Sequence, residues 1–380
     1  MNSPFISIII PVRNAERTLG TTFEYLSRID YPRDRLEVII AEGGSTDNTV
    51  EVIAKLQKTN PFITMVSIPN CPSPGYARNK ALDLAKGEYI FFTDGDCAPS
   101  ANWIKDIIRK FEEDPEIGLI GGEIYTLTVD PDNLVEAYCE NFGFNRVSWR
   151  YGGIGEGYFP QLSDRYPSEI AGHRCYFFVT ANVACRSAIV REKGFRFWDR
   201  PTGEDMEFNY RVKEAGWKLY FMPHASVDHM HRASFKNLRT VWVGYGQGQS
   251  PLVKLHAKHK LEIIFQIIKG MPRIAIPFPI KGFIYIGNFH LMHFSAFLGI
   301  VSLIIGLFFP GFGAGEIVSI IMFVLAGYFF YPFHLHCYYM NPRKHYVTWL
   351  KMKYLTNWDF IKGGIKGFFK HGVICIEPSF

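Results

Sequence analysis

The sequence predicts an α/β domain with a mostly parallel central sheet, followed by a helical C-terminal part that associates with a membrane. In the N-terminal part, short apolar runs alternate with stretches of helical periodicity, and Gly-rich turns join them. That alternation is typical of a parallel sheet whose two faces are covered by helices. In the C-terminal part, two long stretches are nearly free of charge, and each exceeds the roughly 20 residues that a membrane-spanning helix needs.

The expected elements of the N-terminal part follow one another closely. We expect strands at 5–11, 36–41, 63–68 and 88–93, and helices at 14–28, 49–57 and 75–85. The first strand, FISIIIP, is a continuous apolar run, as in strands that are buried on both faces. Ligands of such sheets bind beyond the carboxyl ends of the strands. The turns that start at Pro11, Glu42 and Asp94 are therefore expected to form the binding edge.

The region 100–240 is less regular, and we expect it to contain the substrate-binding half of the domain. Its segment 151–160, YGGIGEGYFP, contains four glycines and no apolar period. We expect a mobile loop near the site, with a disordered surface loop as the alternative. Substrate specificity is expected to reside in residues 120–180.

The composition excludes several classes of protein. Aromatic residues make up 16% of the chain and charged residues 20%, which excludes a disordered protein. The net charge of +5 is unevenly distributed, because residues 261–380 carry a balance of +6 and residues 1–260 a balance of −1. A nucleic-acid-binding module needs a basic face on its folded domain, so we expect no nucleic-acid partner. The positive C-terminal part instead fits anionic membrane lipid.

The cysteines and the N-terminus indicate a cytosolic location for the first domain. Seven Cys are scattered without metal-ligand spacing, which fits free thiols in a reducing compartment. The segment MNSPFISIIIPVRN lacks the basic region, long apolar core and cleavage site of a signal peptide.

The uncharged stretches 283–309 and 317–340 are expected to form a transmembrane hairpin in the cell membrane. Basic residues precede and follow the pair, so the positive-inside rule places both flanks in the cytoplasm. The alternatives are a pair of buried core helices and a hairpin that enters the membrane without crossing it. The flanking segments combine aromatic rings with Lys and Arg, which predicts interfacial helices. The expected domains are therefore 1–240, 241–282 (interfacial), 283–340 (hairpin) and 341–380 (interfacial tail).

The most informative local pattern is Thr93-Asp94-Gly95-Asp96, which places two carboxylates directly after an apolar strand. One carboxylate can reach a divalent cation while the other meets a hydroxyl of a sugar or ribose. Gly95 allows the backbone to turn closely around a ligand. Mg²⁺ and Mn²⁺ take hard oxygen ligands and are often shared with substrate phosphates. Taken alone, such a pair of carboxylates is an ordinary turn in most proteins.

Several motifs occur in a fixed order along the chain. Residues 5–16, 37–50, 75–82 and 87–96 are followed by Gly203-Glu204-Asp205. This ordered set resembles the family 2 glycosyltransferases with the Rossmann-like GT-A fold, over about residues 5–240. The C-terminal part resembles the membrane-anchored branch of that family, including exopolysaccharide enzymes that build on polyprenyl-linked acceptors. The resemblance implies a nucleotide-sugar donor and Mg²⁺ or Mn²⁺ as the cofactor.

The resemblance also implies roles for individual residues. The implied nucleotide-sugar-binding residues are Pro11, Arg13, Asn14, Glu16, Glu42, Arg78, Asn79, Asp94, Gly95 and Asp96. The first four belong to the turn that wraps the base and ribose. Glu42 takes the place of an Asp that contacts uracil, and Arg78 can face the diphosphate. Asp47 is expected to cap a helix and Lys80 to be solvated.

Asp205, with Glu204 beside it, matches the motif that supplies the catalytic base. In an inverting transfer, a carboxylate deprotonates the acceptor hydroxyl opposite the departing nucleotide diphosphate. The metal neutralises the charge that grows on that diphosphate. The alternative is an acidic pair at a helix N-terminus, which the helix dipole favours.

The implied metal ligands are Asp94, Asp96 and a histidine. Either His229 or His231 could serve and the sequence does not choose; we take His231 as the candidate, with an ordinary hydrogen-bonded His as the alternative. The QxxRW motif of processive relatives is absent, which favours the addition of one sugar.

The sequence thus predicts an inverting, metal-dependent glycosyltransferase of the hexosyltransferase type at the cytoplasmic membrane face. It would move a sugar from a nucleotide-sugar, expected to be a UDP-sugar, to a lipid-linked or membrane-proximal acceptor in polysaccharide biosynthesis. The competing hypotheses are a catalytically silent membrane scaffold and a nucleotidyltransferase. The latter would need a Gly-rich phosphate loop with Lys or Arg, which the first turn lacks.

Overall fold

A computed structural model describes most of the chain. The described residues are 3–161, 165–172, 174–258, 260–266, 273–309, 314–340 and 345–378. They form two compact units. The first comprises Met1–Arg165 and Glu169–Leu238, and the second comprises Tyr166–Ser168 and Arg239–Phe380.

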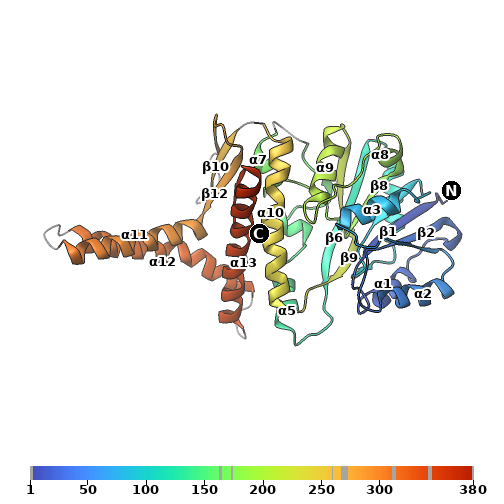
Figure 1. The fold of residues 1–380 in the computed structure, drawn as a ribbon, viewed down its shortest axis with the longest axis horizontal. Helices are drawn as coiled ribbons and strands as arrows, with labels where there is room; N and C mark the ends of the chain where they lie inside the picture. The colour runs from blue at the N-terminus through green and yellow to red at the C-terminus, as the bar shows by residue number, and fades with distance from the viewer. Residues whose placement is uncertain are drawn as a thin grey trace. The chain divides into compact units, whose positions relative to one another are not determined.

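The first unit is built on a nine-stranded mixed sheet of order β3-β2-β1-β4-β8-β6-β9-β5, with β7 paired to β9 (Figure 1). The strands are β1 (Ile6–Val12), β2 (Leu36–Glu42), β3 (Ile63–Ser67), β4 (Tyr89–Phe92), β5 (Cys97–Pro99), β6 (Ile117–Leu127), β7 (Gly157–Tyr158), β8 (Val183–Arg186) and β9 (Lys218–Met230). The first four are mutually parallel, as expected. Strand β8 runs antiparallel to both β4 and β6, so the second half of the sheet is mixed.

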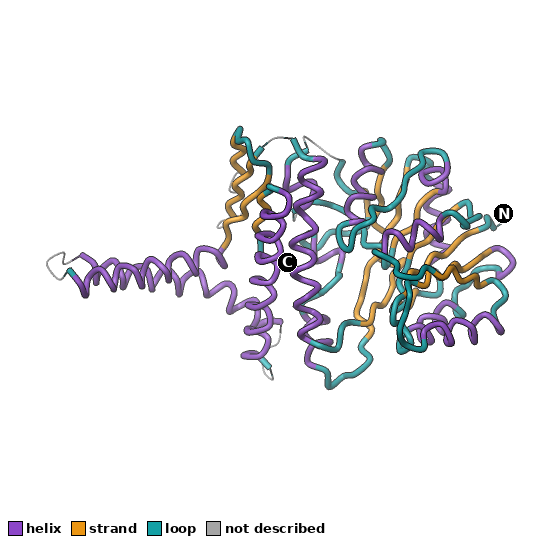
Figure 2. The backbone as a smooth tube through the Cα atoms, in the orientation of Figure 1, coloured by secondary structure: helices purple, strands orange, loops and turns teal. Residues whose placement is uncertain are grey.

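The helices of the first unit cover this sheet (Figure 2). They are α1 (Leu19–Leu26), α2 (Thr49–Thr59), α3 (Pro74–Leu82), α4 (Trp103–Glu113), α5 (Leu134–Asn141), α6 (Val147–Arg150), α8 (Ser187–Arg191) and α9 (Glu204–Glu214). Helix α7 (Pro167–Ala171) is divided between the two units. Helix α3 begins where Ser73 accepts the N–H of Tyr76 and Pro74 takes the first helical position. The apolar side chains of β1 are buried, which confirms a strand covered on both faces.

Two expected boundaries in the first unit differ from the structure. The helix expected over 14–28 begins only at Leu19, because residues 14–18 form the turn after β1. Asn14 has a φ of 55°, a left-handed conformation that a helix does not contain. The glycine-rich segment 151–160 contains β7, which pairs with β9, so part of the expected loop extends the sheet.

The second unit contains a small sheet that the sequence reading missed. Its strand order is β11-β10-β12-β13. The strands are β10 (Leu261–Gln266), β11 (Arg273–Ile276), β12 (Gly282–Gly287) and β13 (Ile374–Ile376). The segments 241–282 and 341–380 were expected as interfacial helices. They contribute helix to α10 (Phe235–His256) and α13 (Tyr346–His371), and strands to this sheet. Arg239 of α10 forms a two-bond ion pair with Asp359 of α13, with distances of 2.6 and 3.0 Å.

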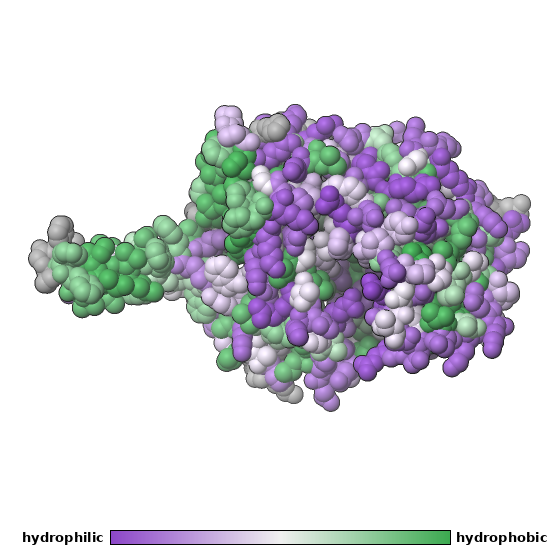
Figure 3. All heavy atoms as spheres, viewed as in Figure 1, coloured by the Kyte–Doolittle hydropathy of each residue, from purple (hydrophilic) through white to green (hydrophobic). Residues whose placement is uncertain are grey.

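Two apolar helices form a hairpin in the second unit, α11 (Asn288–Phe308) and α12 (Ala314–Met340). Both are long and apolar enough to cross a membrane, and only 17% and 11% of their most apolar windows are buried. Hydrophobic residues, coloured green, dominate the hairpin in Figure 3. Core helices of a soluble protein are mostly buried, so this exposure argues against the buried-core alternative. Helix α11 starts five residues later than expected, because residues 283–287 pair in β12.

Candidate active site

The turns after β1 and β2 are joined by hydrogen bonds at the carboxyl edge of the sheet. The N–H of Asn14 donates to Ser45 Oγ at 2.9 Å, and the Asn14 side-chain oxygen accepts the N–H of Thr46 at 2.8 Å. Glu16 Oε2 accepts the backbone N–H of Asn48 at 3.0 Å. Asn14 and Glu16 therefore hold the two turns together, and the neighbouring Arg13 side chain is exposed at the same edge.

The acidic residues of the second turn have structural partners. Glu42 is only 2% exposed, and its Oε1 accepts the N–H of Ser45 at 2.5 Å. Asp47 accepts the N–H of Thr49 at 3.1 Å, at the start of α2, and the N–H of Glu16 at 3.2 Å. The N-cap of α2 is Asn48 and not Asp47 as expected, but Asp47, one residue earlier, supports the helix start through the N–H of Thr49.

A buried arginine connects the turn after β4 to the start of α9. Arg78 is 3% exposed; its Nη2 donates to Asp94 Oδ1 at 2.9 Å and its Nη1 to Glu204 Oε1 at 3.0 Å. Burial opposes the charge on this guanidinium, but Asp94, Glu204 and Asp205 raise its pKa above the ordinary value. The structure therefore brings together three acidic residues that the sequence assigned to two separate motifs.

The segment before α9 is fastened to α3 at several further points. The Asn79 side chain exchanges two hydrogen bonds of 2.8 Å with the backbone of Phe197. Ser73 Oγ donates to Asp199 at 2.6 Å. A Cβ on Gly75 would lie 2.1 Å from the carbonyl oxygen of Trp198, so only glycine fits there. Asn79, expected beside the nucleotide, holds the chain that leads to Glu204.

Glu204 and Asp205 sit in different environments at the first turn of α9. Burial raises the pKa of Glu204 to about 7, and the neighbouring Asp205 adds to this while Arg78 opposes it. Burial also raises the pKa of Asp205, against the N–H of Met206, which donates to its carboxylate at 2.8 Å, and against Arg78 and Arg150. Arg150, at the end of α6, was not among the residues predicted from the sequence. Its positive charge lowers the pKa of Asp205 and so opposes the effect of burial.

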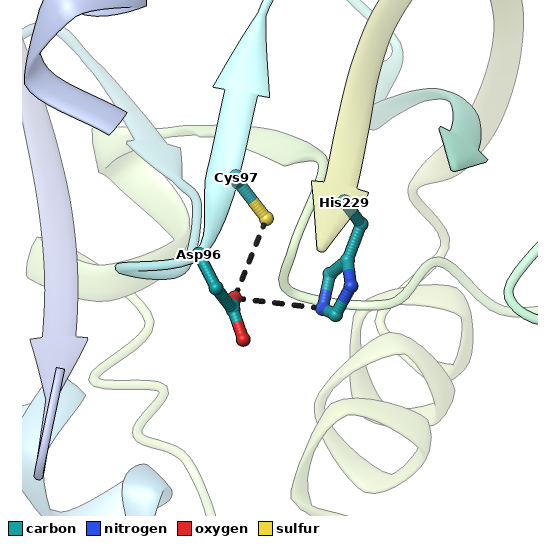
Figure 4. Close-up of side chains that lie close together, drawn as sticks. All are labelled: Asp96, Cys97 and His229. Carbon is teal, nitrogen blue, oxygen red and sulfur yellow. Dashed lines mark hydrogen bonds and ion pairs between the residues drawn. The ribbon is translucent and has the colours of Figure 1, made fainter. Parts of the chain in front are cut away.

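The second carboxylate of the Asp-Gly-Asp turn meets a histidine from a distant strand (Figure 4). Strand β5 pairs with β9, which places Cys97 opposite His229. Asp96 Oδ1 lies 3.5 Å from His229 Nε2 and 3.9 Å from Cys97 Sγ. These three residues form a group whose potential ligand atoms lie within 4.8 Å of one another. A Cβ on Gly95 would lie 2.8 Å from Val12, so this turn needs glycine.

His231 has a different partner from His229. Its Nε2 shares a hydrogen bond of 2.8 Å with Thr126, and its ring packs edge-on against Phe144. Burial lowers the pKa of His231 to about 3, so this side chain is neutral. His229 lies in β9, whereas His231 follows Met230, the last residue of that strand, and the centroids of the two rings are 5.6 Å apart. The pairing of β5 with β9, which the sequence does not reveal, selects His229 as the neighbour of Asp96.

Two family models match the chain. The model of glycosyl transferase family 2 matches residues 7–159, and that of glycosyl transferase family group 2 matches residues 89–334, well over half of the chain. The chain belongs to the family 2 glycosyltransferases. This confirms the expected enzyme class, a glycosyltransferase that uses a nucleotide sugar in glycan biosynthesis.

Individual relatives of this glycosyltransferase extend over much of its length. The dolichyl N-acetyl-alpha-D-glucosaminyl phosphate 3-beta-D-2,3-diacetamido-2,3-dideoxy-beta-D-glucuronosyltransferase of Methanococcus voltae is 25% identical over 256 residues, which is 66% of this chain and 74% of the relative. The probable glycosyltransferase YdaM of Bacillus subtilis is 23% identical over 340 residues, which is 86% of this chain and 72% of the relative.

A solved structure confirms the expected GT-A fold. The mannosyltransferase PcManGT from Pyrobaculum calidifontis, in complex with GDP-Man and Mn²⁺, superposes with a TM-score of 0.53. The similarity covers 97% of this chain and 88% of the mannosyltransferase, at 15% sequence identity. The mixed α/β sheet followed by C-terminal helices is therefore the family's fold.

Proposed function

We propose that this glycosyltransferase is an inverting, metal-dependent enzyme that moves a sugar from a UDP-sugar to a lipid-linked acceptor at the cytoplasmic face of the membrane. The proposal rests chiefly on Arg78, which links Asp94 at the expected donor edge to Glu204 at the start of α9. A donor bound at that edge would therefore lie within reach of an acidic pair held by the same guanidinium.

Asp205 is the proposed catalytic base. Glu204 is engaged by Arg78, whereas Asp205 accepts a backbone N–H from Met206 and keeps acceptor capacity on its carboxylate. Its raised pKa makes it a stronger base than a solvated Asp. In the proposed reaction Asp205 takes the proton of the acceptor hydroxyl as its oxygen attacks the anomeric carbon, and the bond from that carbon to the nucleotide diphosphate breaks to release the nucleotide diphosphate. Glu204 keeps Arg78 in place and adds negative charge beside the base.

Asp96 and His229 fit a divalent cation such as Mn²⁺ or Mg²⁺. Asp96 Oδ1 and His229 Nε2 face each other at 3.5 Å, and no hydrogen bond is formed between them. Burial raises the pKa of Cys97 well above its ordinary value, and Mn²⁺ and Mg²⁺ prefer the oxygen and nitrogen ligands that Asp96 and His229 offer. When bound, the cation would neutralise charge on the leaving diphosphate. Because Asp94 pairs with Arg78, we assign Asp94 to donor binding and not to the metal. His229, which faces Asp96, replaces His231 as the proposed histidine ligand.

The first two turns are proposed to bind the nucleotide. Pro11 lies near the end of β1, and Arg13 and Asn14 follow that strand at the carboxyl edge of the sheet, where ligands of parallel sheets bind. Glu16 and Glu42 shape these turns through backbone hydrogen bonds. Asn79 is proposed as a positioning residue, because its hydrogen bonds to the backbone of Phe197 hold the segment that leads to Glu204.

The hairpin of α11 and α12 supports a membrane-proximal acceptor. Its exposed apolar surface fits a bilayer, and the hairpin would hold the catalytic domain, which belongs to the same chain, at the membrane. The relative from Methanococcus voltae is named for a dolichyl-linked acceptor, which favours a lipid-linked acceptor here as well. The segments around the hairpin are proposed to contact lipid headgroups through Lys, Tyr and Trp.

The proposed function is tested with the full-length chain purified in detergent. A panel of UDP-Glc, UDP-Gal, UDP-GlcNAc and GDP-Man, each labelled in the sugar, is incubated with a membrane lipid extract and Mn²⁺. We expect label to move from one UDP-sugar into the lipid fraction, with inverted anomeric configuration, and chelation to stop the transfer. A product of retained configuration, or full transfer in the presence of a chelator, would contradict the proposal.

A further inference from the structure

The first unit contains a pocket, distinct from the candidate active site, that is lined by residues in and next to α1, β5 and β9. Its volume is about 240 Å³. Its lining includes Tyr25, Arg28, Ser100, Ser226 and Asp228. Pockets for drug-sized ligands measure roughly 300–1,000 Å³, so this one fits a smaller molecule, of the size of a single sugar unit. None of its lining residues belongs to the proposed donor, base or metal groups.

The pocket lies on the reverse face of the strand pair that carries the proposed metal ligands. In the β5–β9 pairing, Cys97 is opposite His229, and Ala98 is opposite Asp228. Successive side chains of a strand point to opposite faces of the sheet. Because His229 faces Asp96, the Asp228 side chain points away from it, into the pocket. The two sites are thus separated by the thickness of the sheet.

Several polar groups around the pocket lack a protein partner within the part of the chain that the structure describes, although Arg28 pairs with Glu24. Ser100 Oγ is buried there without a hydrogen bond. The partly exposed carboxylate of Asp228 and hydroxyls of Tyr25 and Ser226 make no hydrogen bond to a described residue. Buried polar groups are usually satisfied, and an unsatisfied one is costly. A ligand that carries several hydroxyl groups would satisfy them together.

The two charged side chains that line the pocket, Arg28 and Asp228, limit the chemical class of ligand that can bind there. Arg28 lies 4.8 Å from the Tyr25 ring and disfavours a metal cation, whereas Asp228 disfavours an anion. A neutral polyhydroxylated molecule can donate to the carboxylate and accept from the guanidinium. We propose that this pocket is a second carbohydrate-binding site, which holds one neutral sugar unit, free or within a glycan. This inference does not depend on the proposed base or metal ligands.

Saturation-transfer NMR on the full-length chain in detergent tests the proposal. The probes are methyl glucoside, methyl mannoside, methyl galactoside and N-acetylglucosamine, with UDP and Mn²⁺ present in excess to occupy the donor site. We expect saturable binding of at least one probe. Asp228→Asn should weaken it about tenfold or more, because hydrogen bonds to a charged group are the stronger ones. Ser226→Phe, which fills the pocket, should abolish it.

The matched control is Asp132→Asn, which removes an exposed carboxylate on a surface turn and should leave binding unchanged. If one pocket variant fails to fold, the other decides. Absence of saturable binding by every probe overturns the proposal. So does binding that survives in the folded pocket variants, or that UDP and Mn²⁺ displace, because the sugar would then occupy the donor site. Failure of sugar transfer in the donor panel would leave this result unaffected.

Discussion

Arg78 on α3 and Glu204 on α9 are 126 positions apart in the chain, yet Arg78 Nη1 donates to Glu204 Oε1 at 3.0 Å in a buried setting. The other nitrogen of the same guanidinium donates to Asp94. A planar guanidinium presents donors in a fixed fork, so it sets the spacing of the two carboxylates as well as balancing their charge. This relationship couples the donor edge of the sheet to the proposed base.

Arg78→Met should destabilise the protein substantially. The substitution leaves Glu204 buried and unpaired, and breaking a buried ion pair from one side costs about 3–5 kcal/mol. The measurement is the denaturation midpoint in urea or on heating. Lys80→Met, on the exposed face of the same helix, is the control and should change stability by less than about 0.5 kcal/mol. Equal effects of the two substitutions would show that the guanidinium bridge is energetically unimportant.

Asp205→Asn should abolish sugar transfer and leave donor binding intact. The amide preserves the shape of the side chain but cannot accept the proton of the acceptor hydroxyl, and loss of a general base costs about 10²–10⁴-fold. Transfer is followed with labelled donor, and nucleotide affinity by titration calorimetry. Asp132→Asn serves as the control for loss of one negative charge. Normal turnover by Asp205→Asn would require a different base.

The stability of the protein should depend on the ionisation of Glu204. Its pKa is about 7 in the folded protein and near its ordinary value of 4.5 in the unfolded chain. Between these values the folded state holds more protons, so stability is greatest at the acidic end and falls as pH rises towards 7. The slope is at most about 1.4 kcal/mol per pH unit.

Denaturation midpoints at pH 5, 6 and 7 measure this dependence. Glu204→Gln should flatten it, because the substituted side chain does not titrate. Glu51→Gln, at an exposed position of α2, should keep the wild-type slope. The interpretation fails if wild type and Glu204→Gln lose stability in parallel.

His229, in β9, and His231, just after the end of that strand, should respond differently to alanine substitution. His229→Ala removes a proposed metal ligand and should weaken Mn²⁺ binding, which electron paramagnetic resonance of free Mn²⁺ measures. His231→Ala removes the partner of Thr126 and should reduce thermal stability, with Mn²⁺ affinity largely preserved. Equal Mn²⁺ affinity of wild type and His229→Ala would exclude His229 as a ligand.

The hairpin should protect its turn from protease added on the cytoplasmic side. A protease site inserted between Phe309 and Ala314 should stay uncut in sealed vesicles whose cytoplasmic face is exposed, because two spans place it on the opposite side. The same site inserted after Lys193, on an exposed loop of the first unit, should be cut. Cleavage of both at similar rates would contradict a spanning hairpin.

The local elements of the first unit could be read from the sequence. The runs FISIIIP, LEVIIA and EYIFFT became β1, β2 and β4, because continuous apolar β-branched and aromatic residues fit strands covered on both faces. The small sheet of the second unit was missed. Prolines and lysines lie between its strands, so no clear alternation of apolar and polar residues is visible there. Strand β12 is directly followed by the apolar sequence of α11, so the two form one continuous apolar stretch in the sequence.

The sequence by itself determined the family motifs, the parallel half of the sheet and the two apolar helices, because these depend on residue order and local periodicity. Only the tertiary structure decided which side chains meet. It placed Arg78 between Asp94 and Glu204, assigned Asn79 to the backbone of Phe197, and brought His229 rather than His231 to Asp96. These contacts depend on strand pairing and helix packing between segments far apart in the chain. The spacing of residues along one sequence carries no record of that geometry.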